Sequence, residues 1–258
     1  MFHMKLLMII IANIKLITCL QTNVDNIFKE APTIRCNKRS FDTIERLLPT
    51  LFPPGTDQRV PETTVELKQY CNLYDKNKQF ILGYFKSCTG QLSQTVAKIM
   101  LYNIAKQMEL TCKAGKISKQ ARELMTAGKC ANKAKLLIRE CNTKLIDALL
   151  GAKKAPEKSR IYMTCCHSNA YRLCLREATE ETKGCTSHTI DWAEKYVLKM
   201  LGSAINLICG QYFEESDKCL KLIKETPEPQ IPLGKTKPTN FLLPMLDLME
   251  SISEVPNK

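Results

Sequence analysis

Cysteine is the residue type whose chemistry dominates this chain, which contains thirteen cysteines but only three histidines. Removal of the apolar N-terminal stretch together with Cys19 leaves an even number. The remaining cysteines are dispersed and lack the Cys-x-x-Cys or clustered Cys/His spacings of zinc sites. In an exported protein such a set indicates disulfides, so we expect no metal and no cofactor. Sequence leaves the pairing open among Cys36, Cys71, Cys88, Cys112, Cys130, Cys141, Cys165, Cys166, Cys174, Cys185, Cys209 and Cys219.

The stretch from Ile161 to Cys185 holds four of these cysteines. Cys165 and Cys166 are adjacent, and successive side chains on a helix point about 100° apart around its axis. The two residues must therefore have different partners. We expect this stretch to link at least two other segments of the chain.

Histidine and carboxylate patterns give no assembled catalytic set. The double cysteine before His167 resembles the secreted phospholipases A2, where a double cysteine shortly precedes a catalytic His-Asp pair. Here His167 follows Cys166 directly, Ser168 stands where the aspartate would be, and no glycine-rich calcium loop precedes them. A pair formed by His188 and Asp191 lacks the G-x-S-x-G nucleophile motif. We predict that the protein is not an enzyme.

The first residues, MFHMKLLMIIIANIKLITCLQT, indicate a secretory signal peptide over about residues 1–20. The alternative is an uncleaved membrane anchor. Asn13 and Lys15 interrupt the apolar run, which then falls short of the roughly 20 residues that a membrane span needs. We therefore expect a secreted, extracellular protein with no transmembrane span after cleavage.

Positive charge concentrates in the middle of the chain, whose formal net charge is +12. Between Lys113 and Arg160 there are thirteen Lys or Arg and four Asp or Glu. This excess suits an acidic protein, a glycosaminoglycan or a lipid surface as partner, and the alternative is a set of solvated helix faces. No nucleic-acid partner is expected. The candidate anion-binding surface comprises Lys129, Lys133, Lys135, Arg139, Lys144, Lys153, Lys154, Lys158 and Arg160.

Apolar residues recur every three or four positions, and alternating strand patterns are missing. This predicts an all-α protein, a disulfide-clamped bundle of about six to seven helices over residues 21–225. Residues 226–258 contain six prolines and are predicted to form an irregular tail. A short docking helix is expected within this tail at about residues 240–253.

Local signals predict several helix ends. The T-x-x-E capping box at Thr63–Glu66 starts one helix, and Ser118 and Ser187 are predicted N-caps. The polar stretch 75–79 predicts a break, followed by one long helix over 80–112. An aromatic cluster in this region is expected either to belong to the ordinary core or to line an apolar cavity: Tyr70, Tyr74, Phe80, Tyr84 and Phe85.

By signal peptide, dispersed cysteines and length, the chain resembles the secreted, cysteine-rich helical proteins of arthropod haemolymph and saliva, such as the 27 kDa haemolymph glycoprotein. The resemblance assigns no functional residues, and the sequence contains no N-x-S/T sequon. Our leading hypothesis is a secreted, non-enzymatic binding protein that recognises an anionic partner through its basic region. The alternative is an extracellular carrier of a small apolar ligand inside the bundle, and an extracellular hydrolase ranks third.

Overall fold

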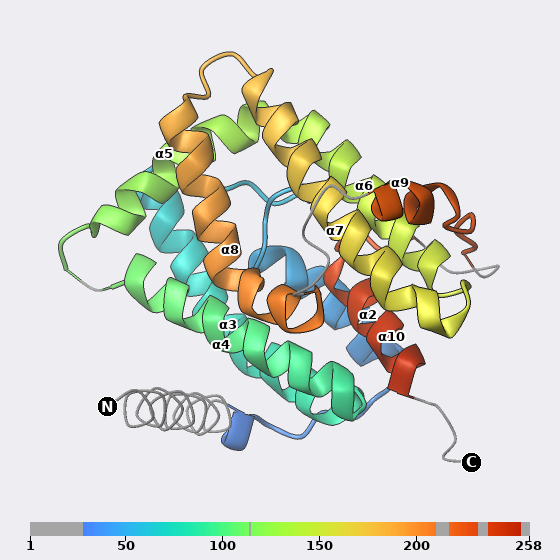
Figure 1. Ribbon diagram of the computed structural model, residues 1–258. Helices are drawn as coiled ribbons and strands as arrows, with labels where there is room; N and C mark the ends of the chain where they lie inside the picture. Colours follow the sequence, from blue (N-terminus) through green and yellow to red (C-terminus); the bar gives the residue numbers. More distant parts are fainter. Residues whose placement is uncertain (1–27, 114, 210–216, 232–236, 254–258) are drawn as a thin grey trace, which may run out of the picture.

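The computed structural model describes residues 28–113, 115–209, 217–231 and 237–253 (Figure 1). The predicted signal peptide and Cys19 lie outside these residues. Within them the chain forms nine α-helices and one short 3-10 helix, without a strand. The all-α prediction is confirmed. The elements are α2 (Lys38–Leu47), η1 (Leu48–Thr50), α3 (Thr64–Cys88), α4 (Gln91–Thr111), α5 (Lys119–Lys133), α6 (Lys135–Ala152), α7 (Glu157–Glu180), α8 (Ser187–Cys209), α9 (Asp217–Lys224) and α10 (Leu242–Ser253).

Six disulfides clamp the helices together and use all twelve predicted cysteines. Cys165 bonds to Cys209 and Cys166 to Cys219, so the adjacent pair ties α7 to both α8 and α9 as its helical geometry requires. The other four bonds are Cys36–Cys88, Cys71–Cys112, Cys130–Cys185 and Cys141–Cys174.

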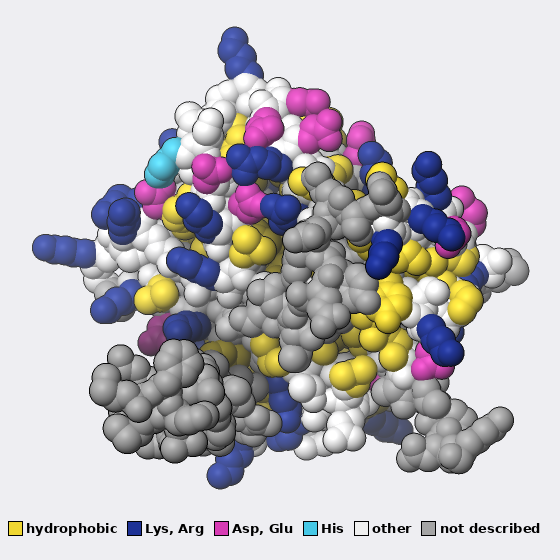
Figure 2. Space-filling model, viewed as in Figure 1, with side chains coloured by type: hydrophobic (Ala, Val, Ile, Leu, Met, Phe, Trp, Pro, Cys, Tyr) yellow, Lys and Arg dark blue, Asp and Glu magenta, His cyan; other side chains and the backbone are white. Residues whose placement is uncertain are grey.

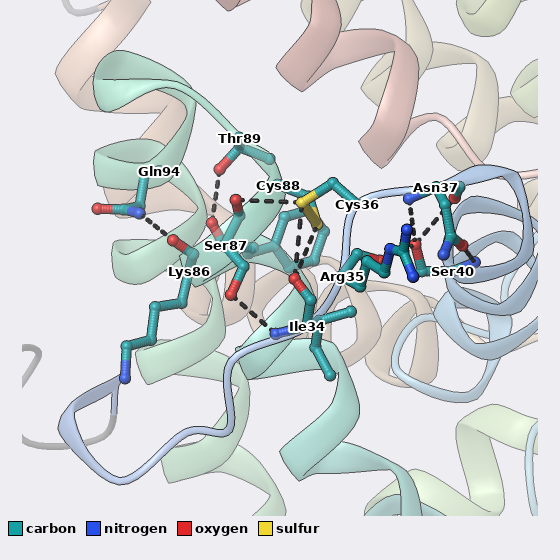
Figure 3. Close-up of a disulfide and its surroundings, with 11 residues drawn as sticks. Ile34, Arg35, Cys36, Asn37, Ser40, Lys86, Ser87, Cys88, Thr89 and Gln94 are labelled. Atoms are coloured by element: carbon teal, nitrogen blue, oxygen red, sulfur yellow. Dashed lines mark hydrogen bonds between the residues drawn. A yellow bond between two sulfur atoms is a disulfide. The ribbon is translucent and has the colours of Figure 1, made fainter.

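The segment before α2 is fastened to the end of α3 by the Cys36–Cys88 disulfide (Figure 3). Beside the disulfide, the Ile34 amide donates a hydrogen bond of 3.0 Å to Ser87 Oγ. The next residue, Asn37, caps α2, since its Oδ1 accepts from the Ser40 amide at 3.0 Å. The crosslink therefore also positions the start of a helix.

Two predicted N-cap residues are confirmed and one is wrong. Thr63 and Glu66 form the reciprocal capping box, and Ser118 Oγ accepts from the Ala121 amide. Helix α8 begins at Ser187, but its capping hydroxyl belongs to Thr186, which accepts from the Thr189 amide at 3.3 Å.

The predicted break at 75–79 does not occur, because α3 runs through it. Lys78 pairs with Asp75 at 2.7 Å on the solvent side of the helix, while Asn77 between them is buried. The break falls instead at Gly90, whose amide donates to Glu250 Oε2 at 2.9 Å. A Cβ built on Gly90 would lie 1.5 Å from Glu250 Oε1, so only glycine admits this contact.

The core extends from the lead-in segment to α10. Phe241, Leu242, Leu248 and Met249 are each at most 4% exposed and belong to the same cluster as the helices before them. Helix α10 packs against α4, α6 and α7. Across the stretches given above, no helix combines the length and apolar character that crossing a bilayer requires.

Extended proline segments lie directly on helices at glycine positions. A Cβ on Gly128 would sit 2.4 Å from the Pro61 carbonyl oxygen, and one on Gly151 would sit 2.0 Å from that of Pro227. Both glycines lie inside helices, where glycine is unfavourable by roughly 0.5–1 kcal/mol relative to alanine. Close approach of a neighbouring backbone is the physical reason for their presence.

Candidate functional site

An apolar cavity of about 160 Å³ lies where α7 and α8 diverge. Figure 1 shows the two helices spreading apart from the loop that joins them, and Pro54, which precedes α3, also lines the cavity. Helices α5 and α6 and the beginning of α10 complete the wall. Disulfides secure three of these elements, because Cys165–Cys209 joins α7 to α8 and Cys141–Cys174 joins α6 to α7.

Helical spacing places the wall residues on one face of each helix. On α8 they follow steps of three and four from Ile190 through Ala193 and Val197 to Leu201, so that face looks into the cavity. The described residues of the wall are Pro54, Ala127, Cys130, Ala131, Ile138, Leu145, Leu149, Ser168, Asn169, Tyr171, Arg172, Leu175, Arg176, Thr179, Thr189, Ile190, Ala193, Glu194, Val197, Leu198, Leu201, Gly202, Ile205, Phe241 and Met245.

The cavity extends from the core to the surface. Leu149 and Leu145 are 1% and 5% exposed, while Leu198, which also lines the wall, is 43% exposed. The wall thus includes both buried and exposed residues. The wall itself is almost wholly apolar.

Most polar side chains of the wall already have partners. Thr179 Oγ1 donates to the Leu175 carbonyl at 2.9 Å, and the Thr189 hydroxyl lies 2.9 Å from that of Thr186. Tyr171 differs: its side chain is half-buried, but its hydroxyl is buried and has no hydrogen-bond partner among the described residues. Burial raises the pKa of this hydroxyl, which stays neutral at physiological pH.

Charged side chains gather where the cavity wall meets solvent between α7 and α8. Glu194 Oε1 pairs with Arg172 Nη1 at 2.6 Å, and Glu194 Oε2 pairs with Arg176 Nη1 at 2.8 Å. Arg176 also pairs with Asp191 at 3.1 Å and with Glu180 at 2.9 Å. We call these five residues the rim cluster.

The two described histidines lie outside the cavity and apart from any catalytic partner set. His167 is half-buried, its Nε2 lies 2.8 Å from Thr226 Oγ1, and burial lowers its pKa. Thr226 Oγ1 donates to the Leu222 carbonyl, so His167 Nε2 is the donor in this contact. His188 is exposed, and Asp191 is engaged by Arg176 instead of by a histidine. Within the described ranges, no group of three or more potential metal ligands is found.

The nine basic candidates do not converge. They run from the end of α5, along α6 and the α6–α7 turn, to the start of α7, so Lys133 and Lys153 flank a helix about 27 Å long. Arg139 pairs with Asp57 and Lys153 with Asp247, while Lys135 and Arg160 donate to backbone carbonyls. On the face drawn in Figure 2, Lys and Arg side chains are interspersed with Asp and Glu. Five have no ion-pair or hydrogen-bond partner within the described part of the chain: Lys129, Lys133, Lys144, Lys154 and Lys158.

The cavity does not lie at the aromatic cluster where the sequence suggested one. Tyr84 and Phe85 are buried in the core, Tyr70, Tyr74 and Phe80 pack against it, and none of the five lines the cavity. The core alternative for this cluster is therefore confirmed. The actual wall comes from α7 and α8, whose cavity-facing residues look like ordinary helix faces until the two helices are seen to diverge.

Comparison with known proteins gives no further assignment. No protein-family model, no curated protein and no solved structure matches this chain. The resemblance to arthropod haemolymph proteins therefore stays a prediction, and the case for function depends on the geometry of the cavity.

Proposed function

We propose that this protein is a non-enzymatic, extracellular carrier of a small apolar molecule, which it binds in the cavity between α7 and α8. The observation that carries the proposal is an apolar cavity of about 160 Å³ that reaches the surface beside Leu198. Six disulfides and a helical scaffold suit a binding protein that must persist in an oxidising compartment.

The size of the cavity sets the size of the ligand. An engineered apolar cavity of about 150 Å³ in another protein is large enough for benzene and stays dry when empty. A single-ring molecule or a short branched chain therefore fits here, whereas a long fatty acid does not. Burial of about 200 Å² of apolar ligand surface contributes roughly 5 kcal/mol, which corresponds to an affinity of about 0.1–1 mM.

The test is titration of the folded, disulfide-intact protein with toluene and ethylbenzene, followed by calorimetry and by chemical-shift changes. The variant Ala193→Leu places a larger side chain in the wall, and we expect it to reduce the affinity at least tenfold. Ala105→Leu is the matched control, because Ala105 is also a half-buried helical alanine but does not line the cavity. Absence of binding to the parent protein, or equal loss in both variants, contradicts the proposal.

A second candidate function is recognition of an anionic partner through the five lysines on α5, α6, the α6–α7 turn and the start of α7 that have no partner among the described residues. If these lysines act together, retention on heparin or on anionic vesicles should weaken steeply between ~50 and ~300 mM salt, because interactions between exposed charges are screened beyond about 10 Å at 0.1 M salt. The double variant Lys144→Gln with Lys154→Gln should be retained less strongly than the parent protein at the same salt concentration. Retention that ignores salt contradicts this candidate.

A further inference from the structure

Glu194 is unusual among the residues that line the cavity. It is the one acidic residue in the described part of the wall, on a face of α8 that otherwise presents Ile190, Ala193, Val197 and Leu201. Its side chain is only 20% exposed. A carboxylate this well covered is retained only where cations neutralise it.

Both of its partners also belong to the cavity wall. One carboxylate oxygen faces Arg172 and the other faces Arg176, at 2.6 and 2.8 Å. Each guanidinium therefore donates one N–H to Glu194, which makes that N–H unavailable to a ligand. Charge-assisted contacts of this length are the strong kind of hydrogen bond.

The rim cluster carries more negative than positive charge. Two arginines face three carboxylates, because Asp191 and Glu180 also pair with Arg176 from outside the wall. An entering carboxylate therefore meets no unpaired guanidinium there. A neutral molecule needs no cationic partner.

From this arrangement we infer that Glu194 is the specificity-determining residue of the cavity: it restricts the ligand to compact, neutral apolar molecules and excludes carboxylates of the same size. The inference depends on the proposed function, since it concerns which molecules the same cavity accepts. Arg172 and Arg176 would form a carboxylate-binding pair if Glu194 did not occupy them.

Substitution Glu194→Gln makes the consequence measurable. Arg176 keeps its contacts with Asp191 and Glu180. Arg172 loses its charged partner and keeps Asn169 Oδ1, at 3.3 Å, with at most the neutral amide oxygen of the new side chain. Arg172 then becomes available to a ligand carboxylate. The variant should fold, because the Cys165–Cys209 disulfide still joins α7 to α8 and the ion pairs it loses are partly exposed.

The experiment compares nitrobenzene with benzoate, which have nearly the same shape and number of non-hydrogen atoms but differ in charge. In the parent protein nitrobenzene should bind at least about 30-fold more tightly than benzoate. In Glu194→Gln this ratio should fall about tenfold, the value of one charge-assisted hydrogen bond. The gain in benzoate affinity should shrink as salt is raised.

Three variants make the test specific. Glu180→Gln removes a partner of Arg176 that does not line the cavity, so it should leave the ratio within about twofold of the parent. Adding Arg172→Gln to Glu194→Gln should abolish the gain in benzoate binding. Arg172→Gln alone, in a chain that keeps Glu194, should raise the preference for nitrobenzene. This single variant replaces Glu194→Gln as the test if Glu194→Gln does not fold.

The outcomes separate the two proposals. If neither nitrobenzene nor toluene binds the parent, the carrier function itself is wrong. If nitrobenzene binds but benzoate binds equally well, or if Glu194→Gln leaves the ratio unchanged, the carrier function stands and the role of Glu194 is refuted.

Discussion

Removal of the Cys141–Cys174 disulfide should lower the free energy of unfolding by about 4 kcal/mol. The perturbation is the double variant Cys141→Ala with Cys174→Ala, which unfastens α6 from α7 at the back of the cavity. The bond spans 33 residues of sequence, and closure of an isolated loop of that length is worth about 4 kcal/mol in the chain-entropy model.

Two structural features adjust this magnitude in opposite directions. The bond lies inside the loop closed by Cys130–Cys185, which already restricts the unfolded chain and reduces the entropic part to about 3 kcal/mol. Cys141 is 2% exposed and packs with Ile138, Ala134 and Ala178, so loss of its sulfur leaves a small void worth about 1 kcal/mol.

The assay is thermal unfolding followed by circular dichroism and calorimetry. A loss of about 4 kcal/mol corresponds to a fall in Tm of about 10 °C for a chain of this size. The control is Cys36→Ala with Cys88→Ala, which removes a bond of separation 52 whose Cys36 end is exposed. Its free energy of unfolding should fall by the entropic contribution of the closed loop, without a loss of packing at Cys36. A fall of less than about 3 °C at Cys141 and Cys174 would refute the loop-constraint reasoning.

The remaining predictions concern single side chains. Because burial lowers the pKa of His167, the unfolded chain binds more protons below about pH 6.5, so the free energy of unfolding should fall from pH 7 to pH 5. His167→Gln should flatten this dependence in urea titrations, whereas His188→Gln, at an exposed position, should not. Gly202→Ala should raise the free energy of unfolding by about 0.5–1 kcal/mol, because its Cβ would make only ordinary contacts, from 3.7 Å, with the described residues. Gly151→Ala should lower the free energy of unfolding, because its Cβ would meet a carbonyl oxygen at 2.0 Å. A gain in stability for both variants in chemical denaturation would contradict this. Tyr171→Phe removes a buried hydroxyl without a partner and should raise the free energy of unfolding by about 1 kcal/mol, so a loss of similar size would show that the hydroxyl is bonded.

Local patterns predicted helices well where one residue acts on its own neighbours. The capping box at Thr63 and the cap at Ser118 depend on contacts within three residues, and both were foreseen. The break at Gly90 was missed, and Glu250, which accepts the hydrogen bond of the Gly90 amide there, lies 160 positions away in sequence. The site was missed for a related reason, since Glu194, Arg172 and Arg176 look like solvent-facing charges on amphipathic helices until the cavity between them is known.

The sequence by itself determined the helical class, the twelve cysteines that crosslink it and the requirement that Cys165 and Cys166 take different partners. These follow from side-chain periodicity and from the angle between successive residues on a helix, which are properties of the local chain. Tertiary structure alone decided which cysteines pair, where α7 and α8 diverge and that Glu194 occupies the arginines at the rim. Pairing and cavities depend on distances between segments far apart in the chain, and no local pattern encodes those distances.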